Sequence, residues 1–381
     1  MTAGPVRKVL IVGGGIGGLC LASALRDRGL EVDLVELQRE WTVYGVGIIQ
    51  QCNVIRAMAD LGLMDRYLGA GFPFEGVGMY AADGRPLARI PGQRLAGPQY
   101  PANLGISRLA LHTVLSAAAL EKGTAVRLGT TVERLDQGDA SGTSGGVDVT
   151  FSDGTTGRYD LVVGADGLYS KVRGLLFPEA PTPRFTGQAV WRHNFPRPAE
   201  IDHLATFAGP DGYAGLCPLS HDLMYLFLTS EEPGNPRMPA DQLHTLMRDR
   251  LKPFGGLVGA LRERITDPAQ VVYKPMEVLM MPAPWYRGRV VLLGDAVHAT
   301  TPHLGQGAGM AIEDAVVLAE LLPQDAAIGD LLDRYMERRF ERCRFIVDSS
   351  ILAGEWEMAR RQDVDRVGLV KTMLEVTARP V

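Results

Sequence analysis

The residues in this sequence that are most clearly suited to chemistry are glycines that follow a short apolar run. Gly13-Gly14-Gly15-Ile16-Gly17-Gly18 fits the pattern G-x-G-x-x-G directly after Val9 to Val12. Between a strand and a helix, this pattern forms a tight turn where a pyrophosphate can approach the helix amides and the positive end of the helix dipole. We therefore expect a dinucleotide to bind at Gly13, Gly15, Ile16 and Gly18.

An acidic residue follows at the separation that such a site requires. Glu36 ends a predicted second strand, about twenty residues after the glycines. A carboxylate in this position accepts hydrogen bonds from the ribose hydroxyls of adenosine and repels a 2′-phosphate. The site is therefore predicted to hold FAD or NAD and not NADP.

A second glycine-rich turn lies far downstream and repeats the arrangement of the first. The apolar residues Val290 to Leu293 lead into Gly294 and Asp295, and Pro302 precedes the run Gly305-Gln306-Gly307-Ala308-Gly309. A buried strand again runs into a glycine-rich helix start. A nucleotide site assembled from both ends of the chain predicts a large cofactor held across the fold.

The elements around the first turn predict the architecture of this domain. Val9 to Val12 suits a strand that is buried on both faces of a parallel sheet. Small and apolar residues recur at helical spacing from Ile16 to Arg28, and Gly29 ends the helix. With the strand Glu31 to Glu36, they form a βαβ unit, which predicts an α/β fold with a doubly wound, Rossmann-like sheet.

The middle of the chain has a different pattern. Short β-rich runs separated by turn formers predict an antiparallel sheet inserted between two halves of the nucleotide domain. A helical segment is expected from Ile328 onward. The predicted strands are Gln188 to Asn194, His203 to Phe207, Tyr213 to Leu219 and Met224 to Thr229.

Composition excludes several classes of function. The 381 residues carry a formal net charge of -5, so there is no general attraction to nucleic acid or to anionic membranes. The four cysteines are scattered without a C-x-x-C pair, which argues against a zinc site and a disulfide framework. We find no signal peptide and no membrane-spanning apolar run, so a cytoplasmic protein without membrane contact is expected.

Three motifs together resemble those of a known enzyme family. The run Gly164-Ala165-Asp166-Gly167 is similar to the D-G motif of the single-component FAD-dependent aromatic hydroxylases, and Gly294-Asp295 is similar to their G-D motif. These are the class A flavoprotein monooxygenases related to para-hydroxybenzoate hydroxylase. With Gly13 to Gly18, the motifs occur in the family's order and at comparable spacing across almost the whole chain.

The resemblance implies how the domains divide and which residues hold the flavin. Residues 1–72, 98–183 and 283–330 would form a discontinuous FAD-binding domain, 73–97 and 184–282 a substrate-binding sheet domain, and 331–381 a C-terminal helical segment. Asp295 would lie near the ribityl chain, and amides after Pro302 would face the flavin ring. Two departures are Leu37, where many relatives carry a basic residue, and Gly309, where asparagine is usual. The cofactor residues implied in this way are Val46, Gly47, Arg108, Val132, Asp166, Asp295, Gly305, Gly307 and Ala308.

The resemblance also implies an activity. NADH or NADPH would reduce FAD as a transient co-substrate, which agrees with the absence of a second dinucleotide pattern. Dioxygen would then form a C4a-hydroperoxyflavin that hydroxylates a small phenolic or N-heteroaromatic substrate. The protein would work as a monomer or homodimer, without a metal.

Substrate residues follow from alignment to relatives that act on hydroxylated N-heterocycles. Tyr213, Cys217 and Tyr225 fall at strand positions that face substrate, and Tyr213 stands where those relatives use arginine or histidine. Strand alternation puts Arg192 and His193 on opposite faces, so either residue could reach the pocket. The predicted substrate-binding residues are Ile49, Arg192, Tyr213, Cys217, Tyr225 and Pro302, and the predicted catalytic residues are His193, Tyr213 and Tyr225.

Two other functions remain open. The first is a flavin oxidoreductase of the same fold that does not insert oxygen. The second is a non-enzymatic flavin-binding module, for which the basic residues Arg338, Arg339, Arg342 and Arg344 would form the interaction surface. The simpler interpretation of these arginines is a solvated face of a terminal helix.

Overall fold

The computed structural model describes residues 6–41, 46–138, 145–210, 212–361 and 363–381. Its flavin-side domain is built on a six-stranded sheet with β1 (Lys8–Val12) in the middle. The order is β18 (Tyr286–Arg287), β19 (Val290–Leu292), β12 (Leu161–Gly164), β1, β2 (Glu31–Glu36) and β8 (Ala125–Leu128). All neighbours are parallel except the edge strand β18. The predicted doubly wound α/β fold is confirmed.

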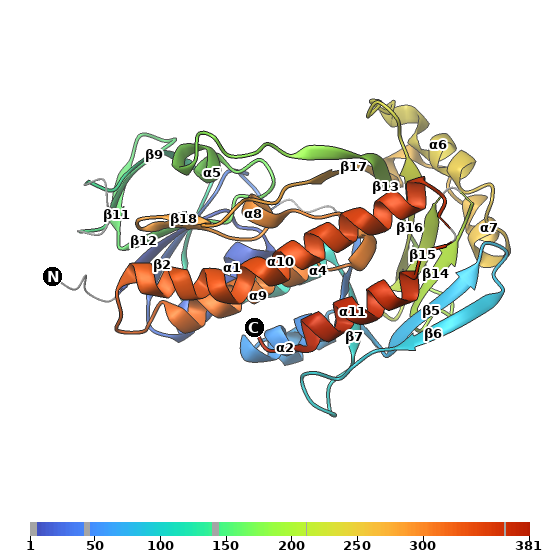
Figure 1. Cartoon of the computed structure of the whole chain (residues 1–381), viewed down its shortest axis with the longest axis horizontal. Helices are drawn as coiled ribbons and strands as arrows, with labels where there is room; N and C mark the ends of the chain where they lie inside the picture. Colours follow the sequence, from blue (N-terminus) through green and yellow to red (C-terminus); the bar gives the residue numbers. More distant parts are fainter. Residues whose placement is uncertain (1–5, 42–45, 139–144, 211, 362) are drawn as a thin grey trace.

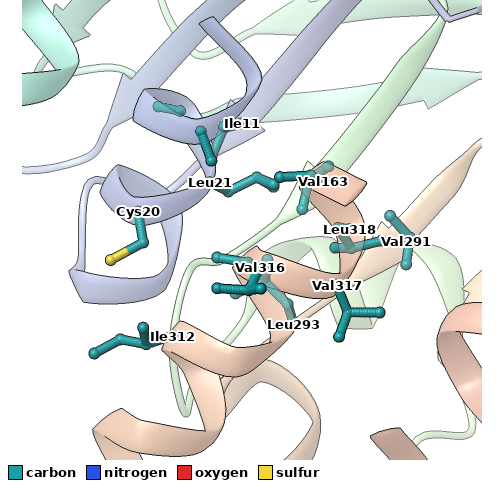
Figure 2. Close-up of a cluster of buried hydrophobic side chains, with 14 of the residues drawn as sticks. Ile11, Cys20, Leu21, Val163, Val291, Leu293, Ile312, Val316, Val317 and Leu318 are labelled. Atoms are coloured by element: carbon teal, nitrogen blue, oxygen red, sulfur yellow. The ribbon is translucent and has the colours of Figure 1, made fainter. Parts of the chain in front are cut away.

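Helices α1 (Ile16–Asp27) and α9 (Gly307–Leu321) pack against each other beside this sheet. Figure 2 shows how Leu21 of α1, Val316 of α9 and Leu293, which follows β19, gather in one buried cluster. α4 (Arg108–Glu121) also packs on α1, and α5 (Lys171–Leu176) follows β12. A separate antiparallel sheet contains β9 (Val132–Asp136), β10 (Val147–Phe151) and β11 (Thr156–Tyr159).

The second domain is a seven-stranded sheet whose inner strands match the predicted runs. Its neighbours are antiparallel except for one parallel pair, β14 with β5. One face is covered by α6 (Leu243–Arg250) and α7 (Gly256–Arg262), which bury Trp191, Ala214 and Leu226. The order is β17 (Val272–Val278), β13 (Arg184–Pro196), β16 (Leu223–Glu231), β15 (Tyr213–Pro218), β14 (Leu204–Ala208), β5 (Gly76–Ala81) and β6 (Pro86–Pro91).

A small sheet joins the two domains. It contains β3 (Gly47–Gln50), β7 (Asn103–Ser107) and β4 (Phe72–Phe74), and the helices α2 (Cys52–Asp60) and α3 (Met64–Gly69) follow β3. A Cβ atom on Gly47 would lie 2.1 Å from the Tyr225 ring, and one on Gly105 would lie 1.8 Å from the Pro218 carbonyl oxygen. Glycine at both positions therefore allows β3 and β7 to contact β15 and β16 directly.

The chain ends in two helices, α10 (Ile328–Met358) and α11 (Arg366–Ala378). α10 runs diagonally across the molecule from the flavin-side domain to the seven-stranded sheet (Figure 1), where it contacts β13. The remaining short helices are α8 (Asp295–His298) and the 3-10 turns Ala240–Gln242, Pro268–Gln270 and Pro302–Leu304. Within the described residues, no helix combines the length and the apolar character that a membrane span needs.

The interpretation of the basic residues on α10 as a solvated face is wrong for two of the arginines. Arg339 is fully buried and pairs with Glu313 and Asp314 of α9. The Arg342 side chain is 9% exposed and pairs with Glu313. Helical spacing alone could not reveal these partners, because they lie on another helix. The same burial removes two of the four arginines from the interaction surface that a non-enzymatic binding module would use.

Candidate flavin and substrate site

The dinucleotide turn has the shape that the first glycine motif predicts. Gly13 has a φ of +112°, and a Cβ atom there would lie 2.3 Å from the Ala165 carbonyl oxygen. A Cβ atom on Gly18 would lie 2.1 Å from the Gly13 carbonyl oxygen. Gly15 is exposed, and no heavy atom lies within 4 Å of its Cβ position. The turn is therefore closely packed behind Gly13 and Gly18 and open at Gly15, beside the half-buried Ile16, which suits a pyrophosphate.

Glu36 lies at the end of β2, where its carboxylate accepts hydrogen bonds from the backbone N–H groups of Gly14 and Gln38, both at 2.8 Å. Each oxygen keeps a lone pair that can accept from a ribose hydroxyl. The Trp41 ring lies 2.5 Å from the Cβ position of Gly14 and 4.8 Å from the ring of His112. Trp41 therefore covers this turn, a role that sequence reasoning missed.

Two other predicted cofactor residues, Val132 and Asp166, lie next to protein groups near these turns. Val132 is fully buried at the start of β9, close to where the Thr130 N–H donates to the Glu36 carbonyl oxygen at 2.9 Å. Asp166 accepts hydrogen bonds from the Ser170 hydroxyl at 2.5 Å and the Lys171 N–H at 2.7 Å. The Asp166 carboxylate therefore accepts hydrogen bonds from the first residues of α5, and in the structure it stabilises the start of this helix.

Asp295 and Arg108 lie near each other at the second glycine turn. The Asp295 side chain is exposed, yet burial among surrounding protein atoms raises its pKa, while His298 and Arg108 act in the opposite direction. This combination is expected for a carboxylate at the bottom of an open recess. Arg108 is exposed at the start of α4, and its backbone N–H donates to the Val46 carbonyl oxygen at 2.9 Å. The structure thus brings together three predicted flavin residues from distant parts of the chain.

A buried network of charged side chains contacts the second glycine turn. Asp314 accepts from the Gly294 N–H at 2.9 Å, pairs with Arg339 at 2.7 Å and lies 2.6 Å from His298 Nε2. Burial raises the pKa of Asp314, but His298 and Arg339 outweigh it and lower the value to about 2. Ligand atoms of His298, Asp314 and Cys343 lie within 4.8 Å of one another. We assign no metal here, because the Arg339 cation contacts both Asp314 and Cys343.

The turn after Pro302 explains the unusual Gly309. Asn53 of α2 donates to Gln306 Oε1 at 3.0 Å and accepts from Gln306 Nε2 at 3.1 Å. A Cβ atom on Gly309 would lie 2.9 Å from Gln306 Oε1 and from Val54. The amide pair of Asn53 and Gln306 therefore fills the space that an asparagine at position 309 would need. Pro302 is exposed, Gly305 has a φ of +65°, and Gly307 and Ala308 are half-buried at the start of α9.

The face of the seven-stranded sheet opposite α6 and α7 faces the flavin-side domain. Cys217 and Tyr225 are paired neighbours on this face, where they contact Gly105 and Gly47. Ile49 packs against the same cluster. Burial raises the pKa of Tyr225 and of Cys217, so both stay protonated near neutral pH. Three of the predicted substrate residues therefore lie together.

The next row along this face contains Arg192, Phe227 and Gly215, which are cross-strand neighbours. A Cβ atom on Gly215 would lie 2.1 Å from the Phe227 ring, so the ring covers this glycine. Burial lowers the pKa of Arg192 to about 10, with Tyr225 raising it and Arg108 lowering it further. Among the described residues, none forms an ion pair or hydrogen bond with the Arg192 guanidinium. Phe227 was missed from the sequence, although its alternation with Tyr225 could have indicated it.

His193 does not belong to this face. It is 4% exposed and packs 4.4 Å from the Phe195 ring, on the side that α6 and α7 cover. Burial lowers its pKa. Because side chains alternate between the two faces along β13, Arg192 faces the site and His193 does not. The prediction of His193 as a catalytic residue is therefore wrong, and we leave it out of the site. Tyr213 lies on the correct face but at its far end, where Arg366 lies 5.6 Å from its ring.

Comparison with known proteins agrees with this geometry. The family model described as the FAD binding domain matches residues 7–350. The chain is 35% identical to 2-heptyl-3-hydroxy-4(1H)-quinolone synthase of Pseudomonas aeruginosa, covering 92% of this chain and 90% of that protein. It is 32% identical to aurachin C monooxygenase/isomerase of Stigmatella aurantiaca, with coverage of 92% and 90%.

A solved structure has a similar overall fold. Klebsiella pneumoniae HpxO, crystallised with FAD and uric acid, has a TM-score of 0.83 at 26% identity, covering 98% of this chain and 92% of that chain. The open dinucleotide turn, Glu36 and the exposed Asp295 carboxylate near Arg108 fit FAD. The chain therefore belongs to the single-component FAD-dependent aromatic hydroxylases and is a flavoprotein monooxygenase.

Proposed function

We propose that this monooxygenase consumes NADH or NADPH and dioxygen to hydroxylate a small N-heteroaromatic ring that carries an ionisable hydroxyl group. The observation that carries this proposal is the row of Arg192, Phe227 and Gly215. This row lies on the sheet face between two contacts. On one side β15 and β16 contact the small sheet, and on the other side α10 contacts β13. The row combines a flat aromatic ring with a cation that has no ion pair or hydrogen bond among the described residues, so it suits a planar, anionic ligand.

The names of relatives support the same substrate class. One relative is named for a quinolone, and HpxO was crystallised with uric acid. Both compounds are N-heterocycles whose ring carbons carry oxygen atoms. Since Tyr213 supplies no fixed positive charge at the other end of the face, we place the anionic oxygen of the substrate at Arg192.

FAD would be held by Gly13, Gly15, Glu36, Arg108, Asp295 and the amides from Gly305 to Ala308, and when bound it would supply electron transfer from the nicotinamide and oxygen activation. Arg192 would bind the substrate's hydroxyl group in its deprotonated form and so increase the electron density of the ring carbon that is attacked. Phe227 would orient the ring. Tyr225 would keep its proton and donate a hydrogen bond.

The cysteines have no part in this chemistry. All four are buried and free, and burial raises the pKa of Cys217. A buried, protonated thiol is a poor nucleophile. The absence of a disulfide among them also supports our proposal that the protein acts in the cytoplasm.

The test is a panel of hydroxyquinolines, hydroxypyridines and phenols, scored by stimulated oxidation of NADH or NADPH. Peroxide release is measured in parallel, and the product is analysed after reaction under ¹⁸O₂. We expect one labelled oxygen atom in an N-heterocyclic product. Turnover that continues without dioxygen, or a product without label, would favour an oxidoreductase that does not insert oxygen.

A further inference from the structure

The last helix, α11, reaches both sides of the substrate site. The Sδ atom of its buried Met373 lies 3.6 Å from Nε2 of Gln306, in the turn before α9 that we assign to the flavin. At the start of the helix, Cζ of Arg366 lies 5.6 Å from the centre of the Tyr213 ring, at the far end of the sheet face. In Figure 1, α11 runs from α2 toward the strands β14 and β15. A helix beyond residue 350, where the family match ends, therefore spans the distance from the flavin turn to Tyr213.

The C-terminal end of α11 is fixed by two arginines. The last carbonyl groups of a helix have no partner within it. Arg56 of α2 and Arg342 of α10 donate six hydrogen bonds of 2.7–3.1 Å to these groups, from Val376 to Arg379. Arg342 also pairs with Glu313 of α9. The position of α11 is thus tied to the helix that follows the flavin turn.

Helical spacing shows which side chains of α11 are directed toward the site. Arg366 and Met373 are seven residues apart, so they lie on the same face of the helix, about 10 Å from each other along its axis. Leu369 and Val370 lie between them on this face. Val370 packs against the flavin-side core, and Leu369 is half-buried. The face therefore presents an apolar side chain at Leu369 and a cation at Arg366.

Arg366 has hydrogen-bond donors that no described residue uses. Its Nη2 atom donates to the carbonyl oxygens of Trp356 at 3.0 Å and Arg361 at 3.3 Å. Its Nε and Nη1 atoms form no hydrogen bond or ion pair with the residues that the structure describes. The same holds for the hydroxyl group of the half-buried Tyr213. A guanidinium and a phenol, side by side, are therefore available to one ligand.

The surroundings keep both groups able to donate. Burial raises the pKa of Tyr213, Arg366 lowers it and Glu357 raises it further, so the phenol keeps its hydrogen near neutral pH. The Glu357 carboxylate is already occupied, because it accepts from Gln188 at 2.9 Å and from the Thr229 hydroxyl at 2.5 Å. It is therefore not the acceptor for Arg366.

The chemistry of the two donors favours a carboxylate. Hydrogen bonds between a guanidinium and a carboxylate are roughly twice as strong as those between neutral groups. A carboxylate has two oxygen atoms, so one can accept from Arg366 and the other from Tyr213. A neutral ligand group would gain much less from the charge of Arg366.

We propose that Arg366 and Tyr213 form a second anion subsite that binds a carboxylate substituent of the substrate, and that Arg366 determines specificity for it. The inference rests on the proposed function of the same site, in which the ring lies at Phe227 and Gly215 with its hydroxyl oxygen at Arg192. Tyr213 precedes Gly215 by two residues on β15, so the substituent extends about 7 Å from the ring. The positive charge that the strand lacks at position 213 thus comes from α11.

Binding is measured first, without turnover, from the change in the flavin absorption spectrum of the oxidised holoenzyme. The ligands are hydroxyquinolines that carry a carboxyalkyl chain of increasing length, each paired with its primary amide. We expect the wild type to bind the acid of the best chain length about 10- to 100-fold more tightly than its amide. If no acid binds, or if acid and amide bind equally at every chain length, the proposal is wrong.

Variants of α11 then identify the residue that is responsible. Arg366→Gln should weaken binding of the acid about 10- to 100-fold and binding of the amide less than about threefold. Arg366→Lys keeps the charge and should keep most of the preference for the acid. Tyr213→Phe removes one donor and should weaken binding of the acid about tenfold. Lys371→Gln, which changes an exposed residue of the same helix, is the matched control and should behave as the wild type.

Two outcomes separate this inference from the proposed function. If the acids bind with the expected dependence on Arg366 and no compound is hydroxylated, the subsite stands and the proposed reaction is wrong. If hydroxylation occurs and Arg366→Gln weakens acid and amide equally, the proposed function stands. Arg366 then only holds the end of α10 through Trp356, and the subsite is refuted.

Discussion

At the scale of single residues, two glycines of the dinucleotide turn have opposite requirements. Gly13→Ala would place a methyl group 2.3 Å from a backbone oxygen at a φ of +112°, so we expect it to lower the free energy of unfolding by about 1–3 kcal/mol. Gly15→Ala meets no protein atom and should change that free energy by less than about 0.5 kcal/mol. It should still weaken FAD binding, because the methyl group occupies the space for the pyrophosphate. Denaturant unfolding and the flavin retained after gel filtration measure both effects, and undiminished flavin in Gly15→Ala would contradict this role.

Arg192 is the residue on which the proposed substrate class depends. Arg192→Gln removes the charge, and a hydrogen bond to a charged group contributes about 1.5–3 kcal/mol, so KM should rise about 10- to 100-fold for a substrate with an ionised oxygen. An O-methylated analogue serves as the control and should bind equally to both proteins. FAD affinity should not change, since Arg192 lies on the substrate sheet. A similar rise in KM for both compounds would show that Arg192 has a structural role only.

At the scale of elements, the ion network among α8, α9 and α10 predicts how stability depends on pH. The pKa of Asp314 falls from 3.8 to about 2 on folding, so its ionised form stabilises the protein above pH 3.8, by about 2 kcal/mol. This contribution is lost as the pH falls from about 4 toward 2. Asp314→Asn leaves Arg339 and His298 buried with one partner fewer, which costs about 3–5 kcal/mol near neutral pH.

Urea unfolding of wild type and Asp314→Asn between pH 3 and 7 measures this effect. The difference in the free energy of unfolding should be constant near neutral pH and should decrease below pH 4. Asp348→Asn, an exposed aspartate of α10, is the matched control and should follow the wild type. A difference that does not change with pH would contradict the ionised state of Asp314.

Elements that depend on local sequence could be predicted, and contacts between distant elements could not. Val9 to Val12 and the glycines after it identify β1 and the start of α1, because strand, turn and helix signals lie within a few residues. Alternation on β13 separated Arg192 from His193, but only the position of α6 and α7 shows which face is covered. In the same way, the burial of Arg339 depends on Glu313 and Asp314, which belong to a different helix.

At the scale of the whole molecule, α10 links both domains, so we expect them to unfold together. Trp191 is buried in the seven-stranded sheet and Trp285 in the flavin-side core, which provides one fluorescent probe for each domain. Variants that keep only one of these tryptophans, with phenylalanine at the other positions, should show the same denaturation midpoint. Two separate midpoints would mean that α10 does not couple the domains.

The fold class could be inferred from the order of motifs, but the contact between Glu357 and His303 could not. Glu357 and His303 lie 3.6 Å apart in space and belong to different structural segments. Nothing in the local pattern around either residue indicates the other.

Phe227 lying over Gly215 has a consequence for how this enzyme can diversify. The ring occupies space that exists because residue 215 lacks a side chain. If this row binds the substrate as proposed, exchanging volume between these two positions would change the space available for larger or smaller rings. Substrate range can therefore evolve, or be engineered, through two cross-strand neighbours.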